Sequence, residues 1–204
     1  MTSNKLEQEA KFWLGQPERL AQKLDLLGAT LTQARVHEFN LRFDTPDHNL
    51  SRSLQALRLR QDTRARLTWK GAADPEQGIS ARAEIEVEVS DLPAARAILE
   101  ALGFHVVVVY EKYRAAWQLG PLEVSLDEMP FGHFCEIEGP DEAAIHTAAG
   151  QLGLKWAVRS KLSYLAIFSA LKQACALDMP DLTFASFQGQ AFSLEAINLI
   201  QADE

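Results

Sequence analysis

The sequence predicts an α+β protein with about eight strands, mostly antiparallel, in a sheet that could close into a barrel. Three observations support this prediction. Eight segments alternate between apolar and polar residues, as half-buried strands do. Short breakers lie between most of them, and short connections favour antiparallel neighbours. Four further segments have helical spacing and are long enough to cover one face of such a sheet.

The predicted strands share a period of two. In chain order they are residues 6–14, 35–43, 54–61, 64–70, 80–89, 106–118, 121–127 and 133–138. The breakers include "DTPDHN" at 44–49, "GAADPEQG" at 71–78 and "EMPFG" at 128–132. Gly, Pro, Asp and Asn favour turns, so these segments mark where the chain reverses.

The predicted helices carry recognisable start and stop signals. Residues 17–28 begin with Pro17 and end at Gly28, and residues 91–103 begin with an Asp cap and end at Gly103. Residues 139–153 follow the same pattern, and residues 163–177 are the longest and most apolar segment. After residue 178 we expect a turn, a short apolar segment and a final helix. The chain therefore divides into a main domain, 1–178, and an extension, 179–204, that packs on its outside.

Composition excludes several classes of protein. The chain has 204 residues and a net charge of −8, so a uniform basic face for a nucleic-acid polymer is not expected. No apolar run approaches the roughly 20 residues that span a bilayer, and the N-terminus lacks the apolar region of a signal peptide. Cys135 and Cys175 have no metal-binding spacing, so two free thiols are expected. We expect a cytoplasmic protein with no membrane partner.

The polar faces of the predicted strands are almost entirely charged. Glutamates recur on 6–14, 80–89 and 133–138, whereas arginines and lysines recur on 54–61 and 64–70. A single strand of this kind is ordinarily one wet face of a sheet. Seven such strands suggest instead a closed barrel with its charged faces inside, where buried charges need partners, metals or a ligand.

The types of these charged residues indicate which class of ligand the site would bind. Paired carboxylates on alternate strand positions suit a hard divalent cation such as Mg²⁺ or Mn²⁺. Pairs of arginines suit bidentate binding of phosphate oxygens. Together they indicate a polyphosphate site. The sequence contains neither GxxxxGK[ST] nor GxGxxG, which argues against a P-loop or a dinucleotide-binding fold.

Nine motifs over residues 6 to about 168 resemble, in order, the CYTH superfamily of triphosphate tunnel metalloenzymes. This superfamily includes thiamine triphosphatases, inorganic tripolyphosphatases and class IV adenylyl cyclases. The motifs are "EQEAK" (7–11), "FDTPDHNL" (43–50), "LRLR" (57–60), "LTWKG" (67–71), "RAEIEVEV" (82–89), "EKYR" (111–114), "LEVSLDEM" (122–129), "CEIEG" (135–139) and "KLSYLAI" (161–167). The resemblance implies an eight-stranded antiparallel β tunnel lined by charged residues.

The resemblance also implies roles for individual residues. The metal ligands would be Glu7, Glu9, Asp127, Glu136 and Glu138. The residues that bind the triphosphate would be Lys11, Arg58, Arg60, Lys70, Arg114 and Lys161. The catalytic residues would be Lys11, Glu84 and Glu86. Lys112 would support the site, and three arginines of the same parity would lie at a tunnel mouth or in solvent: Arg64, Arg66 and Arg82.

Three functions remain open from the sequence. The first is hydrolysis of a triphosphate that depends on Mg²⁺ or Mn²⁺, the substrate being inorganic tripolyphosphate, thiamine triphosphate or a nucleoside triphosphate. The second is a class IV adenylyl cyclase that converts ATP to cyclic AMP and pyrophosphate. The third is a non-catalytic module that binds polyphosphate or nucleotides. Hydrolysis is preferred because the sequence shows no motif that reads adenine. A monomer or a homodimer is expected.

Overall fold

The structure is a computed structural model that describes residues 5–72 and 79–204, so most of the breaker predicted at 71–78 lies outside the described residues. Its eight strands are β1 (Lys5–Leu14), β2 (Thr30–Asp44), β3 (Ala56–Gln61), β4 (Ala65–Lys70), β5 (Ser80–Val89), β6 (His105–Leu119), β7 (Leu122–Met129) and β8 (Gly132–Glu138). All eight predicted strands are confirmed. The largest difference is in β2, which begins at Thr30, five residues before its predicted start, and there pairs with the end of β6.

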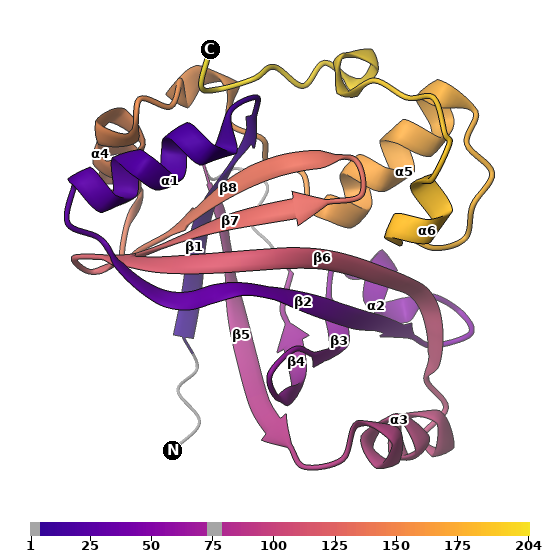
Figure 1. Cartoon of the computed structure of the whole chain (residues 1–204). Coiled ribbons are helices and arrows are strands. Elements are labelled where there is room, and N and C mark those ends of the chain that lie inside the picture. The colour runs from indigo at the N-terminus through magenta and orange to yellow at the C-terminus, as the bar shows by residue number, and fades with distance from the viewer. Residues whose placement is uncertain (1–4, 73–78) are drawn as a thin grey trace.

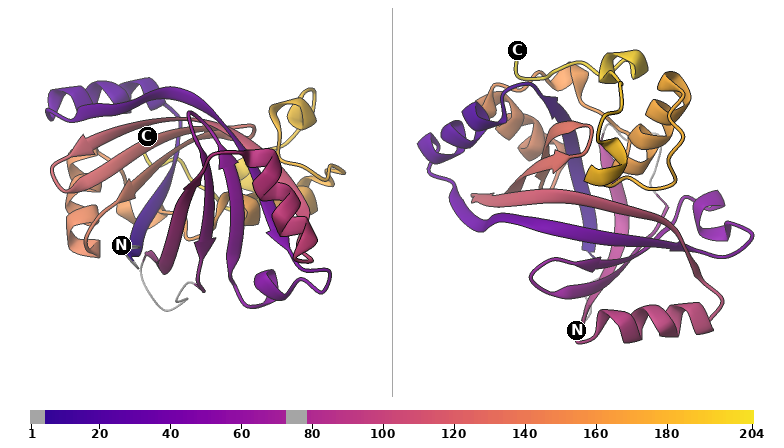
Figure 2. Two further views of the ribbon diagram at one scale, coloured as in Figure 1. Left: turned by 90° about the horizontal axis from the view of Figure 1, so that it is seen from below. Right: turned by 45° about the vertical axis from the view of Figure 1, so that its right-hand side comes forward.

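Every strand pairs antiparallel with two neighbours, and the ring closes in the order β1-β5-β4-β3-β2-β6-β7-β8. The last pair joins the start and the end of the ring, with Lys11 on β1 opposite Glu136 on β8. The strands curve around a common interior (Figures 1 and 2). The predicted α+β tunnel is therefore confirmed.

The helices lie outside this ring. They are α1 (Pro17–Leu26), α2 (Asn49–Arg52), α3 (Leu92–Ala101), α4 (Glu142–Leu152), α5 (Tyr164–Cys175) and α6 (Phe184–Phe187), with short 3₁₀ turns at Trp156–Val158 and Leu194–Ile197. The expected caps are present, since Asp91 accepts from the N–H of Ala94 and Gly153 ends α4 with φ of 72°. α2 and α6, of four residues each, were not predicted.

Outward-facing apolar residues pack against the helices and leave the charged faces inside. Phe12 of β1 and Ile137 of β8 are fully buried with α1 and α4. Leu59 of β3 is fully buried beside α3. Figure 1 shows α1 and α4 together above β1 and β8, with α3 below β2 and β3. Both cysteines are free, as expected, and Cys135 belongs to this dry outer layer.

α5 closes one end of the ring. Near this end the inward positions of four strands are no longer charged but aromatic or apolar: Trp13, Tyr110, Met129 and Phe134. Ile167 and Leu171 of α5 pack into the same buried cluster. The cluster also includes Leu182, Leu194 and Leu199 from the C-terminal segment. The interior therefore changes from charged to apolar along its length.

The C-terminal segment, residues 178–204, crosses the outside of the molecule as a strap. Leu182 exchanges backbone hydrogen bonds of 2.9 Å with Val109 and Glu111 of β6. Asp203 accepts from the N–H groups of Gly15 and Gln16 at 2.7 and 2.8 Å. The predicted final helix is wrong, because only a 3₁₀ turn forms at Leu194–Ile197. It ends at Asn198, whose φ of 60° does not continue a helix.

Within residues 5–72 and 79–204, none of the helices combines the length and the apolar character that crossing a membrane requires.

Candidate active site

A cavity of about 1450 Å³ lies inside the ring. Its walls carry ten basic residues: Lys11, Arg42, Arg58, Arg60, Arg66, Lys70, Arg82, Lys112, Arg114 and Lys161. They also carry seven glutamates: Glu7, Glu9, Glu84, Glu86, Glu123, Glu136 and Glu138. Half of the chain's 20 lysines and arginines, but only a quarter of its 28 acids, therefore line the cavity. The cavity is cationic inside an acidic protein, which favours an anionic ligand.

One wall holds a row of carboxylates. Glu9 on β1 stands opposite Glu138 on β8, and Glu138 stands opposite Glu123 on β7. Glu7 and Glu136 line the cavity on the same two strands, β1 and β8. Like charges directly opposite each other on neighbouring strands repel. A bound cation would relieve this repulsion, and the sequence reasoning had not included Glu123 in the set.

Two lysines at present neutralise part of this row. Lys70 Nζ lies 2.6 Å from each carboxylate oxygen of Glu7. Lys11 Nζ donates to Glu136, and so does the guanidinium of Arg114. Residues predicted to bind phosphate are thus paired with residues predicted to bind metal.

The pKa values in this row follow from burial and from these neighbours. Burial and the nearby charge of Glu136 raise the pKa of Glu9. Burial opposes the charge of Lys11, but Glu136 and Glu9 outweigh it and raise the pKa of Lys11. Burial also opposes the charge of Glu136, but Lys11 and Arg114 outweigh it and hold its pKa well below the ordinary range. Lys11, Arg114 and Glu136 therefore remain charged at neutral pH.

The opposite wall is formed by arginines with unused donors. Four of them have a buried Nε–H that lacks a hydrogen-bond partner within the described residues: Arg58, Arg60, Arg66 and Arg82. The contacts of Arg58 are long: 3.4 Å to the hydroxyls of Tyr110 and Thr68, and 3.9 Å to Glu86. Unpaired buried donors are costly, and a bound anion would satisfy them.

The two acids predicted to be catalytic lie beside this cationic wall. Glu84 lies 3.2 Å from Lys70 Nζ. Glu86 accepts a hydrogen bond of 2.8 Å from the Thr68 hydroxyl and lies 3.5 Å from Arg60 Nη2. Both carboxylates therefore act as counter-ions to the basic residues in the described state.

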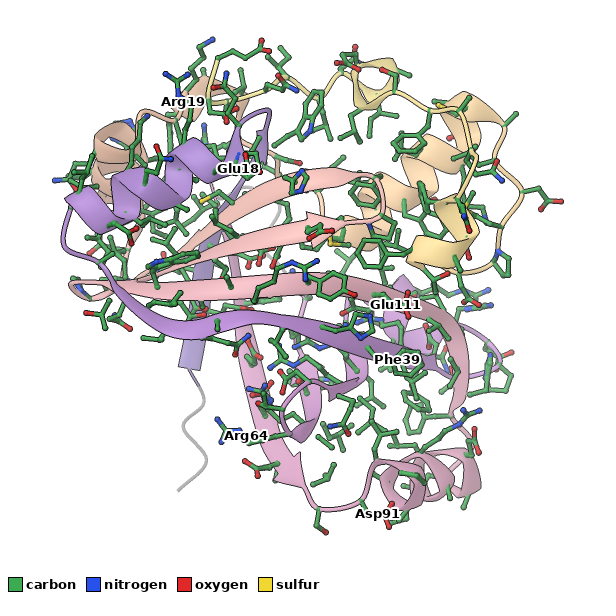
Figure 3. All side chains as sticks on the ribbon, viewed as in Figure 1. Glu18, Arg19, Phe39, Arg64, Asp91 and Glu111 are labelled. Carbon is green, nitrogen blue, oxygen red and sulfur yellow. The ribbon has the colours of Figure 1, made fainter. Side chains whose placement is uncertain are left out.

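The remaining predicted cations differ in whether they line the cavity. Lys161 precedes α5, is exposed and lines the cavity. Arg66 and Arg82 also line it. Arg64 does not, because it sits in the turn before β4 and pairs with exposed Glu88 at 3.1 Å. Figure 3 shows Arg64 pointing away from the ring.

Asp127 lies behind the cavity wall. It is 1% exposed and does not line the cavity. Its carboxylate accepts from Arg114 Nε and Nη2 at 2.6 Å each, from Lys112 Nζ at 3.1 Å and from the Tyr164 hydroxyl at 2.7 Å. The resemblance implied a metal ligand at this position, and that role stays a prediction. In the described state the oxygens of Asp127 accept from the chain's own donors, and Asp127 holds Arg114 and Lys112 in place.

Glu38 is a second buried acid of this kind. It is 1% exposed and lies 3.5 Å from both Arg60 Nη1 and Lys112 Nζ. Burial alone would raise the pKa of Glu38, but Lys112, Arg114 and Arg60 lower it from 4.5 to about 2. Behind the cations that face the cavity there is therefore a layer of buried acids.

Sequence reasoning missed the inward face of β2. Glu38, Asn40 and Arg42 share that face. Asn40 is fully buried, and neither of its side-chain polar atoms has a partner within the described residues. The alternation in "HEFNLRF" already predicted the strand. The inward face of this strand carries one acid, one amide and one base. It therefore lacks the uniform charge by which the other strands were recognised.

The donor chemistry of the carboxylate row fits a divalent metal. Glu7, Glu9, Glu136 and Glu138 offer only carboxylate oxygens, which Mg²⁺ and Mn²⁺ favour. In the part of the chain that is described, no three His, Cys, Asp or Glu side chains are gathered closely enough to hold an ion. Metal binding would therefore require Glu7 and Glu136 to separate from Lys70 and Lys11, which now neutralise them.

Comparison with known proteins agrees with this architecture. A Methanocaldococcus jannaschii protein described as a candidate adenylate cyclase is 28% identical over 135 residues, 65% of this chain and 76% of that protein. The structure of a Vibrio parahaemolyticus protein, also described as a candidate adenylate cyclase, superposes with a TM-score of 0.70 at 24% identity. The match covers 82% of this chain and all of that one.

A third similar protein is a Hippeastrum candidate adenylyl cyclase reported to have a dominant triphosphatase activity. Its structure superposes with a TM-score of 0.59 at 21% identity, over 80% of this chain and 95% of that one. The family profile of the CYTH domain matches residues 5–164, which include all eight strands. A closed ring of eight strands, a charged interior and this match together show that the chain belongs to the CYTH domain family.

Proposed function

We propose that this chain hydrolyses a triphosphate with the help of Mg²⁺ or Mn²⁺. The observation that carries the proposal is the division of one cavity into a carboxylate row and an arginine wall with unused buried donors. Arginine forks suit phosphate oxygens, and carboxylates suit the cation that accompanies them. The triphosphatase activity reported for the similar Hippeastrum protein supports the same reaction.

The ion pairs of the described state suggest the order in which the site would bind metal and triphosphate. Glu7, Glu9, Glu136 and Glu138 would hold the metal, which when bound neutralises phosphate charge and polarises the phosphoryl group. Lys70 and Lys11 would then leave Glu7 and Glu136 and turn to phosphate oxygens. This exchange would keep these two lysines and two glutamates paired with opposite charge before and after substrate enters.

The remaining cations would complete the clamp on the triphosphate: Arg58, Arg60, Arg114 and Lys161. Asp127 and Glu38 would keep Arg114, Lys112 and Arg60 in fixed positions, so that little reorganisation is needed when phosphate binds. A carboxylate, Glu84 or Glu86, would orient the attacking water. Water adds to the terminal phosphorus, the bridging oxygen leaves, and phosphate and a diphosphate are the products.

A cyclase is the second candidate, and the descriptions of the similar Vibrio and Methanocaldococcus proteins favour it. The same clamp would then present the α-phosphorus to the ribose 3′-hydroxyl, and pyrophosphate would leave. A module that binds polyphosphate without turnover ranks third, because Lys11, Glu84 and Glu86, the residues predicted to be catalytic, all line the cavity.

One experiment separates these three functions. The purified chain is incubated with tripolyphosphate, thiamine triphosphate, ATP and GTP, in Mg²⁺ or Mn²⁺, while phosphate, pyrophosphate and cyclic AMP are measured. Release of phosphate supports the hydrolase. Cyclic AMP with pyrophosphate would replace it by the cyclase, and binding without any product would leave only the module.

A pair of variants tests the metal row. Glu9→Gln should abolish turnover while the protein still unfolds cooperatively, because a neutral amide is a poor ligand for a hard cation. Glu18→Gln is the matched control, since Glu18 lies on the surface of α1 outside the cavity (Figure 3). Near-normal activity of Glu9→Gln would remove Glu9 from the ligand set.

A further inference from the structure

The strap lies outside the ring of strands but is bound to it at two separate places. At one of them Leu182 exchanges backbone hydrogen bonds of 2.9 Å with β6, and the Asp181 carboxylate accepts from a β6 N–H at 2.8 Å. At the other, the N–H of Ala202 donates to a β1 carbonyl at 2.9 Å, beside the two contacts of Asp203. In Figure 1 the strap (yellow) passes α6 beside β6 and returns across the top of the view to the C-terminus. The strap is therefore anchored near both of its ends.

The first anchor occupies a place on β6 where the neighbouring strand has ended. β7 pairs with β6 only from Tyr113 onward, so the residues of β6 before Tyr113 do not have β7 beside them. Leu182 lies there instead, and its backbone bonds to the two residues that flank Tyr110. The Tyr110 side chain lines the cavity, and its hydroxyl lies 3.4 Å from Arg58 Nη1. The strap therefore fixes the backbone of a residue that contacts the arginine wall.

Between its two anchors the strap packs on α5. The 3₁₀ turn at Leu194–Ile197 contacts this helix, and Leu194 and Leu199 are buried in the same cluster as Ile167 and Leu171 of α5. Within residues 5–72 and 79–204, no hydrogen bond between main-chain atoms joins α5 to a strand. Side-chain packing therefore sets the position of α5, and the strap supplies part of that packing.

The first residue of α5 reaches the cations of the cavity. The Tyr164 ring centre lies 4.1 Å from Lys11 Nζ and 5.6 Å from Lys112 Nζ, and a cation is attracted to an aromatic ring at such distances. The Tyr164 hydroxyl donates to Asp127, which in turn accepts from Lys112 and Arg114. A displacement of α5 would therefore move a side chain that touches or supports three cations. Packed side chains and hydrogen bonds thus run without a break from the strap to the cationic part of the cavity.

We infer that the strap is a positioning element of the candidate active site: docked on β6 and α5, it holds Tyr110 and Tyr164 where they orient the cations that bind a triphosphate. The strap lies beyond residues 5–164, which match the CYTH profile. The inference rests on the proposed function only in that these cations bind a triphosphate. Linkage makes the effect mutual, because a ligand that binds better when the strap is docked must stabilise docking by the same factor. A strap that only stabilised the fold would show no such linkage.

Variants of the two anchors test this linkage by binding alone. A nonhydrolysable, methylene-bridged analogue of tripolyphosphate is titrated calorimetrically with Mg²⁺ into the full chain. Loss of one anchor hydrogen bond corresponds to about a fivefold change in an equilibrium constant, so Asp181→Ala combined with Asp203→Ala should weaken binding about fivefold or more. The matched control is Asp91→Ala, which removes a carboxylate that accepts from an N–H of α3 at 2.9 Å and should change the affinity less than twofold. Unchanged affinity in the double variant, or an equal loss in the control, overturns the inference.

Amide hydrogen exchange of the parent chain tests the same linkage without any substitution, and it decides the matter if the double variant fails to fold. The analogue should slow exchange of the Leu182 N–H, which bonds to β6, about fivefold or more. Exchange of the Ala94 N–H, at the start of α3, should slow less than twofold. Equal slowing at both amides, or none at Leu182, overturns the inference. A chain whose strap and analogue stabilise each other, but which releases no phosphate from tripolyphosphate, supports the inference while contradicting the proposed hydrolysis.

Discussion

Replacing Tyr164 by Phe removes one hydroxyl and leaves the ring in place. That hydroxyl donates to Asp127 at 2.7 Å, and the two residues are 9% and 1% exposed. The ring also lies 4.1 Å from Lys11 Nζ, a cation–π contact that Phe retains. The substitution therefore tests one hydrogen bond of the layer that supports Arg114 and Lys112.

The expected loss follows from the partners of Asp127. A buried hydrogen bond to a charged group contributes about 1.5–3 kcal/mol. Asp127 keeps its contacts to Arg114 and Lys112, so we expect the lower figure, about 1.5 kcal/mol. For a chain of this size 1 kcal/mol corresponds to about 2–4 °C, which gives a fall in Tm of about 3–6 °C. If the transition state loses the same free energy, kcat/KM falls about tenfold.

The assay is thermal unfolding by calorimetry together with steady-state phosphate release. Tyr113→Phe is the matched control, because it removes the same atom from the outer face of β6. Its hydroxyl has no hydrogen bond within the described residues, and its ring keeps the Arg35 guanidinium at 3.5 Å. Tm and kcat/KM of the control should stay within about 2 °C and twofold of the parent protein. If Tyr164→Phe behaves like Tyr113→Phe, the supporting role of Asp127 is wrong.

Three further predictions concern other parts of the molecule. The pKa of Glu38 is lowered from 4.5 to about 2, so its ionised form adds about 3 kcal/mol to the free energy of unfolding above pH 4.5. This contribution is lost as the pH falls from 4.5 through 2. Urea titrations should therefore show a shallower loss of stability between pH 5 and 2 for Glu38→Gln than for the parent. Asp203→Ala leaves two backbone donors, those of Gly15 and Gln16, without their acceptor and should lower the free energy of unfolding by about 1 kcal/mol; an unchanged urea midpoint would contradict this. Chelation of divalent metal should stop turnover, and added Mg²⁺ should restore it; full activity in chelator would exclude metal dependence.

Alternation along the chain was enough to predict the eight strands and, except for β2, which of their side chains face inward. Glu7, Glu9 and Lys11 line the cavity because a period of two places them on one face of β1. Alternation does not say what lies next to an inward residue. Asp127 has the parity of a ligand, yet Tyr164, from a helix 37 residues later, takes one of its oxygens. Contacts of this kind depend on how α5 packs, which periodicity does not encode.

The elements that were missed are short or irregular. α2 has four residues and is organised by the side chain of Asp44, so no helical period could reveal it. The first residues of β2 are largely exposed and pair with β6 across irregular registers. Their conformation comes from the partner strand, and single-strand patterns are weak there. Both gaps in the prediction lie where tertiary contacts decide the local structure.

The closure of the ring between β1 and β8 also bears on how the protein folds. Lys11 and Glu136 are 125 residues apart in the chain, so their strands meet only after nearly two thirds of the sequence has been placed between them. Contacts of such long range form slowly and late. On a ribosome, β1 emerges first and must wait for β8. The carboxylate row straddles this seam, so a chain that has not completed its ring has only half of that row. If the proposed function is right, assembly of the metal and triphosphate site and completion of folding are a single event, and partly folded chains should not turn over the substrate.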